Sequence, residues 1–455
     1  MEMILEFLRD VLSQPALLIG IMSCVGLIAL KRPFHKIMTG TLKPILGYLM
    51  LAAGAGVIVS NLDPLGKMIE HGFHITGVVP NNEAIVAVAQ KVLGVETMSI
   101  LVVGLLMNLL IARFTKFKYV FLTGHHSLFM ACLMSAVLGT AGLSGIELIL
   151  VGGFLMGAWS AISPAIGQSY TSKVTDGDEI ALGHFGSLGY YLSAWVAKYV
   201  GKAEESTEDI EIPEKWGFLR DSTLSTALTM IVFYLIAAIV AGSEFVATLS
   251  GSMSPYLFAV MSAMNFAVGV AIVYSGVRMI LGDLIPAFQG IATKIIPNAI
   301  PAVDCAVFFT YAPTAVVLGF ISSFIGGIIG MLILGAVGGV LIIPGLVPHF
   351  FCGATAGIYG NATGGRRGAA VGAFLNGLAI TFLPALALPV LGQLGFQNTT
   401  FGDADFAVMG LVLGNAFEWI GMAGIYGVVV IAALVLIIPN FIKTKGKVIN
   451  YVEEE

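Results

Sequence analysis

The sequence predicts an all-α polytopic membrane protein, and its composition, its hydropathy and the spacing of its apolar runs together indicate this class. Of the 455 residues, 57% are hydrophobic and 11% are charged, whereas charged residues make up about 25% of a soluble domain. The mean hydropathy is +0.94. Because a helix needs about 20 apolar residues to cross a bilayer, the chain has room for about eleven spans. The sequence contains no basic tract that would indicate a nucleic-acid partner.

Cations beside the first and last apolar runs predict the orientation of the chain. The first span is expected from Pro15 to Leu30. It is followed by a cluster of cationic and histidine side chains: Lys31, Arg32, His35, Lys36 and Lys43. Such loops stay in the cytoplasm, so the N-terminus is expected outside, and the first residues, MEMILEFLRD, predict no removable signal peptide. Three lysines in the tail, Lys443, Lys445 and Lys447, place the C-terminus inside, and about eleven crossings satisfy both ends.

The apolar runs between these ends predict the remaining spans in order. Spans are expected at about residues 45–59, 98–113, 146–166, 223–247, 255–280, 314–336, 337–357 and 369–390, and an apolar run from Phe406 to Pro439 closes the chain. Residues 62–77 and 283–298 mix apolar and charged side chains, which indicates amphipathic helices lying at the interface. Residues 83–94 are too few to cross and are expected to form a re-entrant half-helix.

A charged stretch, residues 201–221, separates two halves with the same order of parts and is expected to be a cytoplasmic linker. It is either a solvated loop or a docking surface for a soluble partner. The first repeat is expected at residues 1–200, with spans one to five and the first re-entrant half-helix. The second is expected at residues 222–400, with a half-helix that carries Asp304. The last span and a cytoplasmic tail follow at residues 401–455.

Two pairs of motifs indicate that the halves are inverted copies. The segment VVPNNEAIVAVA matches IIPNAIPAVDCA, and FLTGHHSLF matches LIIPGLVPHFF, which pairs His349 with His125 or His126. A copy with an odd number of crossings enters the membrane from the opposite side, so broken helices of both copies would meet near the midplane. Helix N-termini aimed at such a cavity would suit an anionic substrate.

Asp304 is the candidate functional acid, because it lies in the apolar run IIPNAIPAVDCAVFF. Burying an ionised carboxylate is costly unless it is paired or faces water, so an acid inside a membrane segment marks a functional site by default. Pro297, Pro301 and Pro313 predict a short, interrupted helix around it. The alternative is an acid bound to a neighbouring donor for packing alone.

Histidines are the second class of candidates, and cysteines are not candidates. His125 and His126 follow a glycine inside an apolar run, and His184 follows Gly183. Adjacent helical residues point about 100° apart, so only one of the pair needs to face the cavity, and helical metal ligands prefer a spacing of four. Neither a metal nor another cofactor is expected. The four cysteines have no metal-type spacing and are interpreted as small buried hydrophobes: Cys24, Cys132, Cys305 and Cys352.

Several motifs in order resemble a known family. The segments are LTGH, VTDG with Gly183 and His184 after it, GKAEESTED, PNAIPAVDCA and LIIPGLVPHFF. Together they resemble the ascorbate-specific EIIC membrane component of the phosphoenolpyruvate-dependent sugar phosphotransferase system, of the ascorbate/galactitol superfamily, over nearly the whole chain. The resemblance implies a homodimeric, multi-pass elevator-type transporter in the bacterial cytoplasmic membrane. It also implies that the sugar, L-ascorbate in that family, is phosphorylated inside by EIIB, which carries a phosphocysteine and is recharged by EIIA.

The resemblance also implies the substrate-binding residues. In this sequence they are Asn82, Glu83, His125, His126, Ser127, Leu128, Phe129, His184, Phe185 and Asp304. The histidines are expected to donate hydrogen bonds to substrate oxygens, and Asp304 to accept one and to take the hydroxyl proton during phosphorylation. Phe129 and Phe185 stand where the family has glutamine, and Glu83 adds negative charge, so a sugar other than ascorbate stays open.

Two other functions remain compatible with the sequence. An ion- or proton-coupled secondary transporter of a related polyol or sugar would use Asp304, His125 and His184 as a proton relay. A membrane sensor that binds a ligand without moving it is the third hypothesis, and the repeat argues against it.

Overall fold

The computed structural model describes residues 11, 14–74, 77–80, 82–177, 179–210, 222–392 and 399–441. Residues 83–94 and scattered positions in the other elements, such as 15, 55, 98 and 288, are described by their backbone alone. The described helices are α2 (Pro15–Ala29), α3 (Phe34–Phe73), α4 (Asn82–Phe114), α5 (Gly124–Thr140), α6 (Gly145–Val174), α7 (Ser187–Val200), α8 (Ser222–Ala241), α9 (Ser243–Ser250), α10 (Pro255–Lys294), η2 (Cys305–Thr310, a 3-10 helix), α11 (Pro313–Ala336), α12 (Leu346–Gly392), α13 (Ala404–Ile420) and α14 (Met422–Phe441). The short strands are β1 (Val79–Pro80), β2 (Tyr119–Phe121), β3 (Ala181–Leu182), β4 (Ile300–Val303) and β5 (Thr399–Thr400).

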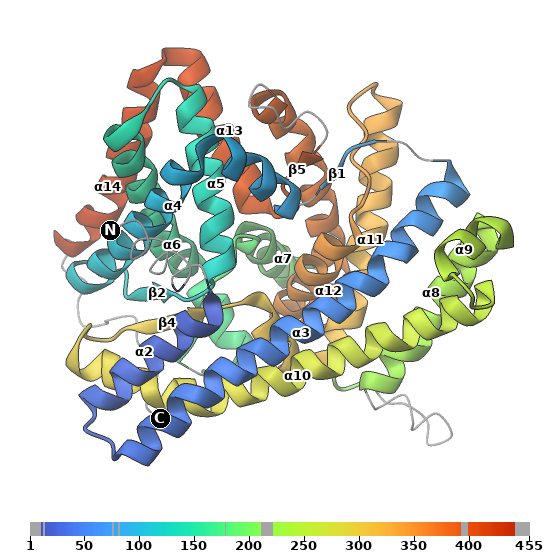
Figure 1. Ribbon diagram of the computed structural model, residues 1–455, viewed down its shortest axis with the longest axis horizontal. Helices are drawn as coiled ribbons and strands as arrows, with labels where there is room; N and C mark the ends of the chain where they lie inside the picture. Colours follow the sequence, from blue (N-terminus) through green and yellow to red (C-terminus); the bar gives the residue numbers. More distant parts are fainter. Residues whose placement is uncertain are drawn as a thin grey trace.

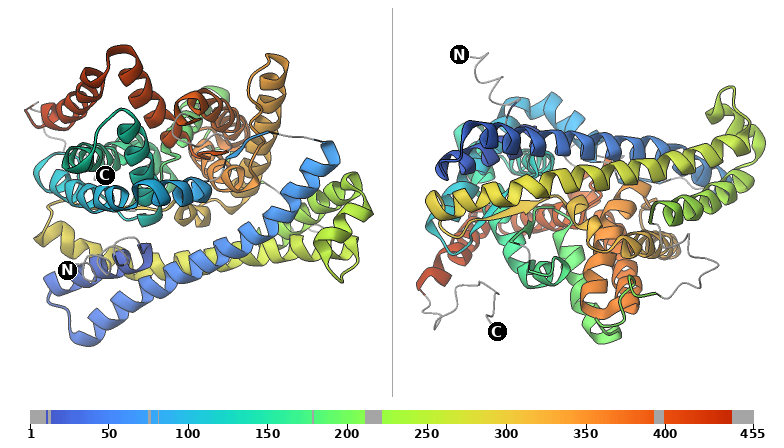
Figure 2. Two further views of the ribbon diagram at one scale, coloured as in Figure 1. Left: turned by 45° about the horizontal axis from the view of Figure 1, so that its top comes forward. Right: turned by 90° about the horizontal axis from the view of Figure 1, so that it is seen from below.

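Helices α2, α3, α8, α9 and α10 form an elongated unit, the arm, along one side of the remaining helices, the body (Figures 1 and 2). The two long arm helices, α3 and α10, lie side by side because glycines let their backbones approach. A Cβ atom on Gly47 would lie 2.8 Å from the Gly276 carbonyl oxygen, and one on Gly54 would lie 2.7 Å from that of Gly269. This close contact fixes the position of every side chain that α3 directs toward the body.

The arm helices differ from the sequence prediction because they do not break. Residues 62–77 and 283–298 were expected as separate interfacial helices, but α3 continues to Phe73 and α10 to Lys294. The physical reason is packing: Leu62, Leu65 and Met68 are fully buried, so tertiary contacts carry the helix through its charged segment. The expected re-entrant half-helix at 83–94 is likewise the first part of α4.

Helix α12 of the body contains a sharp break, at the position where the sequence predicts a loop between the spans 337–357 and 369–390. Helix α12 leaves helical geometry at Gly364 and Gly365, where Gly365 has φ +59°. Its two parts fold back on each other, since a Cβ atom on Gly360 would lie 2.4 Å from the Gly368 carbonyl oxygen. The break lies in the predicted loop YGNATGGRRG, so α12 comprises two antiparallel helices.

Parallel strands connect the two halves of the sequence. Strand β4 lies between β2 and β3, so a second-half strand pairs with two first-half strands. Strand β1 pairs with β5, and Val78 bridges Ile342, so a first-half strand meets two second-half segments. The order of elements from α3 to α7 therefore has a counterpart from α10 to α13, with its central strand exchanged.

The described half of the linker packs against the body. The Glu208 carboxylate accepts hydrogen bonds from the backbone N–H groups of Thr314 at 3.0 Å and Ala315 at 3.1 Å, at the start of α11. The backbone N–H of Thr207 donates to Asn361 Oδ1 at 2.8 Å. Residues 201–210 are thus an ordered strap, and residues 211–221 lie outside the described part of the chain.

Seven helices among the described residues are long and apolar enough to cross a membrane, or up to eight if the bent pair α8–α9 is one span. This confirms the prediction of a helical, polytopic membrane protein. The prediction of about eleven spans stays a prediction.

Candidate functional site

The carboxyl ends of β2, β4 and β3 bring three predicted site residues together. Asp304 directly follows β4, and His125 and His184 follow β2 and β3 within a few residues. Two further backbone bonds extend the pairing to these ends, from Leu122 N–H to the Ala302 carbonyl oxygen at 2.9 Å and from Gly183 N–H to that of Val303 at 2.7 Å. Parallel strands end at one edge of a sheet, so side chains that follow them converge there.

Asp304 begins the 3-10 helix η2 and lies at the inner end of a short chain of polar groups. It is 8% exposed, and its Oδ1 accepts from the Ala306 backbone N–H at 3.3 Å. His125 Nε2 lies 3.4 Å from Asp304 Oδ2. Tyr48 of α3 brings its hydroxyl to 3.1 Å from His125 Nδ1. One member of this chain therefore comes from the arm and two come from the body.

His126 and His184 lie against each other deeper in the body, with ring centroids 3.8 Å apart. The backbone N–H of Phe185 donates to His126 Nδ1 at 3.4 Å, and that of Gly186 donates to His184 Nδ1 at 3.1 Å. A backbone N–H can only donate, so both Nδ1 atoms accept and, in the neutral rings, both Nε2 atoms carry the proton. The two imidazoles thus present N–H donors, as binding of hydroxyl or enolate oxygens requires.

A second acid, Asp403, completes the polar cluster and was not predicted. It is 5% exposed and follows β5 as His184 follows β3. Its Oδ2 accepts from the Asn82 amide at 2.6 Å, and its Oδ1 accepts from the Cys352 thiol at 2.9 Å and lies 3.8 Å from His184 Nδ1. The Gly402 backbone N–H donates to Asn82 Oδ1 at 2.9 Å. The predicted residue Asn82 is therefore oriented by the segment after β5.

The third acid, Asp405, is surrounded by hydrogen-bond donors of the protein itself. It is fully buried and accepts hydrogen bonds from Ser187 Oγ at 2.7 Å, Leu188 N–H at 2.9 Å and Trp159 Nε1 at 3.1 Å. These donors satisfy the start of α7 and join it to α13 and α6. Asp405 therefore fixes the turn after His184.

The other predicted residues divide into those near the cluster and those turned away. The Phe129 ring lies 5.8 Å from the His125 ring and 5.7 Å from the His126 ring. The Phe185 ring is fully buried, stacks on Phe121 at 4.6 Å and meets the His126 ring edge-on at 6.0 Å. The Ser127 hydroxyl donates back to the Thr123 carbonyl oxygen. Leu128 packs in the body core, and the Glu83 side chain lies outside the described part.

His349 and three of the cysteines are buried, and one of these cysteines also belongs to the polar cluster. His349, the expected repeat partner of His125 or His126, hydrogen bonds Ser323 at 2.9 Å between α12 and α11. Cys132, Cys305 and Cys352 are buried as expected, whereas Cys24 is only partly buried. Cys352 nevertheless donates to Asp403, so interpreting it as a hydrophobe alone was incomplete.

Two groups of side chains have the composition of metal ligands. Ligand atoms of His126, His184 and Asp403 lie within 4.8 Å of one another, as do those of His184, Asp304 and Cys305. The Nδ1 lone pairs of both histidines already accept backbone N–H groups, which leaves N–H donors rather than lone pairs on Nε2. The arrangement fits an oxygen-rich solute better than a cation.

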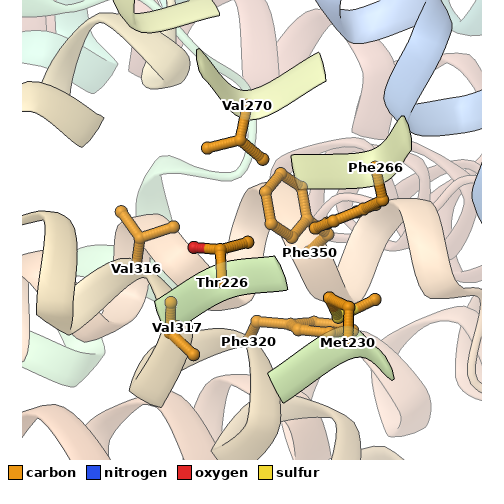
Figure 3. A pocket seen from close by; sticks show the side chains of 8 residues that line it. All are labelled: Thr226, Met230, Phe266, Val270, Val316, Val317, Phe320 and Phe350. Atoms are coloured by element: carbon orange, nitrogen blue, oxygen red, sulfur yellow. The ribbon is translucent and has the colours of Figure 1, made fainter. Parts of the chain in front are cut away.

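A small cavity lies between the arm and the body, away from these polar groups (Figure 3). The space between its lining atoms is about 250 Å³, part of which is open to the surroundings. Its lining is apolar apart from one threonine: Thr226, Met230, Phe266, Val270, Val316, Val317, Phe320 and Phe350. A sugar needs several convergent polar groups, so this cavity is packing space and not a sugar site.

The chain is similar in sequence to sugar permease components. Residues 10–405 match the family model EIIC-GAT, described as the PTS system sugar-specific permease component. Over 417 residues, the chain is 26% identical to the ascorbate-specific PTS system EIIC component of Mycoplasma pneumoniae. The match covers 78% of this chain and 62% of that relative, so the chain spans about 62% of the length of the curated relative it matches.

Proposed function

The chain belongs to the EIIC-GAT family of sugar-specific permease components of the phosphotransferase system, and from this premise we propose its substrate and its partner. It binds a sugar or sugar acid outside, with L-ascorbate as the leading substrate. It carries the substrate inward, where the partner subunit EIIB phosphorylates it. The Mycoplasma pneumoniae relative supports the choice of ascorbate through its description as an ascorbate-specific component.

The observation that carries the proposal is the convergence of N–H donors and carboxylate acceptors at the strand ends. His126 and His184 offer Nε2–H donors, and Asp304 keeps lone pairs beyond the Ala306 and His125 contacts. Helices α5 and α7 begin at the same edge, and their N-termini favour an anionic solute such as an enolate. Adjacent hydroxyl and enolate oxygens match this pattern.

The site residues have a defined role in the proposed phosphoryl transfer. The S–P bond on the EIIB cysteine breaks while an O–P bond to the sugar hydroxyl forms, and the thiolate leaves on EIIB. The hydroxyl proton passes to Asp304, whose carboxylate acts as general base. The carboxylate is 8% exposed, so the site must open toward the cytoplasm before EIIB can reach the sugar.

The transport architecture completes the proposal. Residues 1–200 and 222–400 are inverted copies, which the exchanged central strands β1 and β4 support. The protein is a homodimer that moves by an elevator mechanism, with its N-terminus outside and its C-terminus inside. EIIA recharges EIIB.

The direct experiment measures binding and phosphorylation with purified protein in nanodiscs. L-Ascorbate and a panel of pentoses, hexoses and polyols are titrated, and then EIIB carrying its phosphocysteine is added. We expect ascorbate to bind and sugar phosphate to form only with EIIB. His184→Gln is expected to lose binding, whereas His71→Gln, an arm histidine stacked on Phe245, serves as the matched control. Vesicle uptake of unphosphorylated sugar without EIIB would contradict the proposal.

An ion- or proton-coupled transporter is the second candidate, and the chain of Tyr48, His125 and Asp304 favours it, because these groups could relay a proton. The two functions differ in their energy source. Uptake that follows an imposed pH gradient in vesicles without EIIB supports the proton-coupled transporter, and uptake that ignores the gradient excludes it.

A further inference from the structure

We propose that Tyr48 is a positioning residue of the substrate site, supplied by the arm, which holds His125 in the tautomer that donates to Asp304. The inference rests on the proposed function, because it assigns Asp304 to the sugar. It also divides the site between the two units of the fold.

The hydrogen-bond directions follow from counting protons. An ionised carboxylate only accepts, so the nitrogen 3.4 Å from Asp304 Oδ2, His125 Nε2, carries the proton. A neutral imidazole has one N–H, so His125 Nδ1 accepts, and the Tyr48 hydroxyl 3.1 Å away donates to it. The other neutral tautomer would direct a bare Nε2 lone pair at the carboxylate oxygen, which is repulsive.

Because Tyr48 is buried, its hydroxyl cannot replace the hydrogen bond to His125 by one to solvent. Tyr48 is 6% exposed, and a buried phenol hydroxyl needs a polar partner. The backbone of α3 cannot shift easily to provide another one, because Gly47, the residue before it, packs against the α10 backbone. The hydroxyl position is therefore set by the arm, whereas its acceptor moves with the body.

Among the described residues, Tyr48 and Asp304 are the two groups that act on the ring nitrogens of His125. Within the described residues, Tyr48 approaches from α3 and Asp304 from the end of β4, while the His126 ring on the same helix lies 4.8 Å away and the Phe129 ring 5.8 Å away. Neither ring contact orients an N–H. When the body is displaced along the arm, His125 loses its donor and Asp304 loses a fixed partner.

The first test reads the tautomer without any ligand. The protein in nanodiscs is labelled with ¹⁵N-histidine, and His125 is assigned by the signals lost in His125→Ala. We expect the Nε2–H tautomer of His125 in the wild type and a mixture of both tautomers in Tyr48→Phe, which removes only the hydroxyl. Tyr234→Phe, whose hydroxyl bonds the Asn61 carbonyl oxygen inside the arm, is the control and should leave His125 unchanged. Identical His125 spectra in wild type and Tyr48→Phe would overturn the inference.

The second test is a double-mutant cycle on L-ascorbate binding. Tyr48→Phe alone is expected to weaken binding about tenfold, the size of one lost hydrogen bond. In the His125→Ala background the same change should alter binding less than about twofold, because the effect passes through His125. Equal losses in both backgrounds would show a structural role only and would sink the inference. Asp304→Asn distinguishes failure of this inference from failure of the proposed substrate site. If Asp304→Asn abolishes binding while Tyr48→Phe binds as the wild type does, only the inference about Tyr48 fails. If Asp304→Asn binds ascorbate normally, the proposed substrate site fails as well.

Discussion

Asp304 and Asp405 are two buried acids that each follow a short strand, and their surroundings differ. Asp405 accepts from a hydroxyl, an indole N–H and a backbone N–H, and the two N–H groups can only donate. Asp304 accepts from one backbone N–H at 3.3 Å and from His125 Nε2 at 3.4 Å, and these are two longer contacts. A carboxylate offers about four acceptor positions, so Asp304 retains more capacity for a solute.

The difference separates packing from binding within one molecule. The hypothesis that a buried acid is held by neighbouring donors for packing alone describes Asp405 well. Asp304 accepts from fewer groups than Asp405 does and lies beside histidines that present N–H groups. Substituting each acid in turn therefore tests whether Asp304 serves binding and Asp405 serves packing.

Of these substitutions, Asp304→Asn is expected to weaken ascorbate binding the most. The amide can still accept from Ala306 and can donate to His125 in its other tautomer, so the fold should survive. It cannot take a hydroxyl proton and loses charge-assisted bonds, which costs about 4 kcal/mol of binding, roughly a thousandfold. Calorimetric titration with ascorbate and a thermal melt of the same sample check both parts. Wild-type transport by the variant would dismiss the role of Asp304.

Asp405→Asn should have the opposite profile. However the amide is turned, its NH₂ group faces either the Trp159 indole N–H or the Leu188 backbone N–H. We expect a loss of about 3 kcal/mol in the free energy of unfolding, with affinity of the folded fraction within about threefold of the wild type. The melting temperature and active-fraction titration measure this. If affinity falls as strongly as in Asp304→Asn while the melt is unchanged, the distinction between the two acids is wrong.

The sequence predicted the parts of the site that depend on local chemistry. Asp304, His125 and His184 were recognisable because polar groups beside glycine or proline in apolar runs are costly. Glutamine-to-phenylalanine departures at 129 and 185 were recognisable from the family resemblance. Their consequences were not, since one ring faces the histidines and the other packs on Phe121.

The missing residues depend on contacts between distant segments. Tyr48 meets His125 across 77 positions, and Asn82 meets Asp403 across 321. A tyrosine in an apolar helix has no local signature. For Asp403 a weak signal existed, because Gly402 and Asp403 follow β5 as Gly183 and His184 follow β3, but the two pairs share only the glycine.

Asp403→Asn tests the remaining acid, whose surroundings are intermediate between those of Asp304 and those of Asp405. It keeps an acceptor for the Asn82 amide but removes the charge beside His184. We expect affinity for ascorbate to fall about tenfold, with a smaller loss of stability than in Asp405→Asn. Asp283→Asn, which removes the carboxylate paired with Lys43 on the arm, is the control and should bind normally. Affinity of Asp403→Asn within twofold of the wild type would restrict Asp403 to packing.

Of these substitutions, Phe129→Gln is expected to change the affinity for ascorbate the least. It restores the amide that is typical of the ascorbate-specific family. The ring lies beside both His125 and His126, so an amide there adds a donor and an acceptor where a solute oxygen would bind. We expect ascorbate to bind about threefold to tenfold more tightly relative to neutral sugars. Phe185→Gln is the comparison: its fully buried ring packs on Phe121 and meets the His126 ring only edge-on at 6.0 Å, so the change should lower the melting temperature and shift the sugar preference less than Phe129→Gln does. An unchanged sugar profile in Phe129→Gln would show that this departure is neutral and that specificity rests on the histidines and acids.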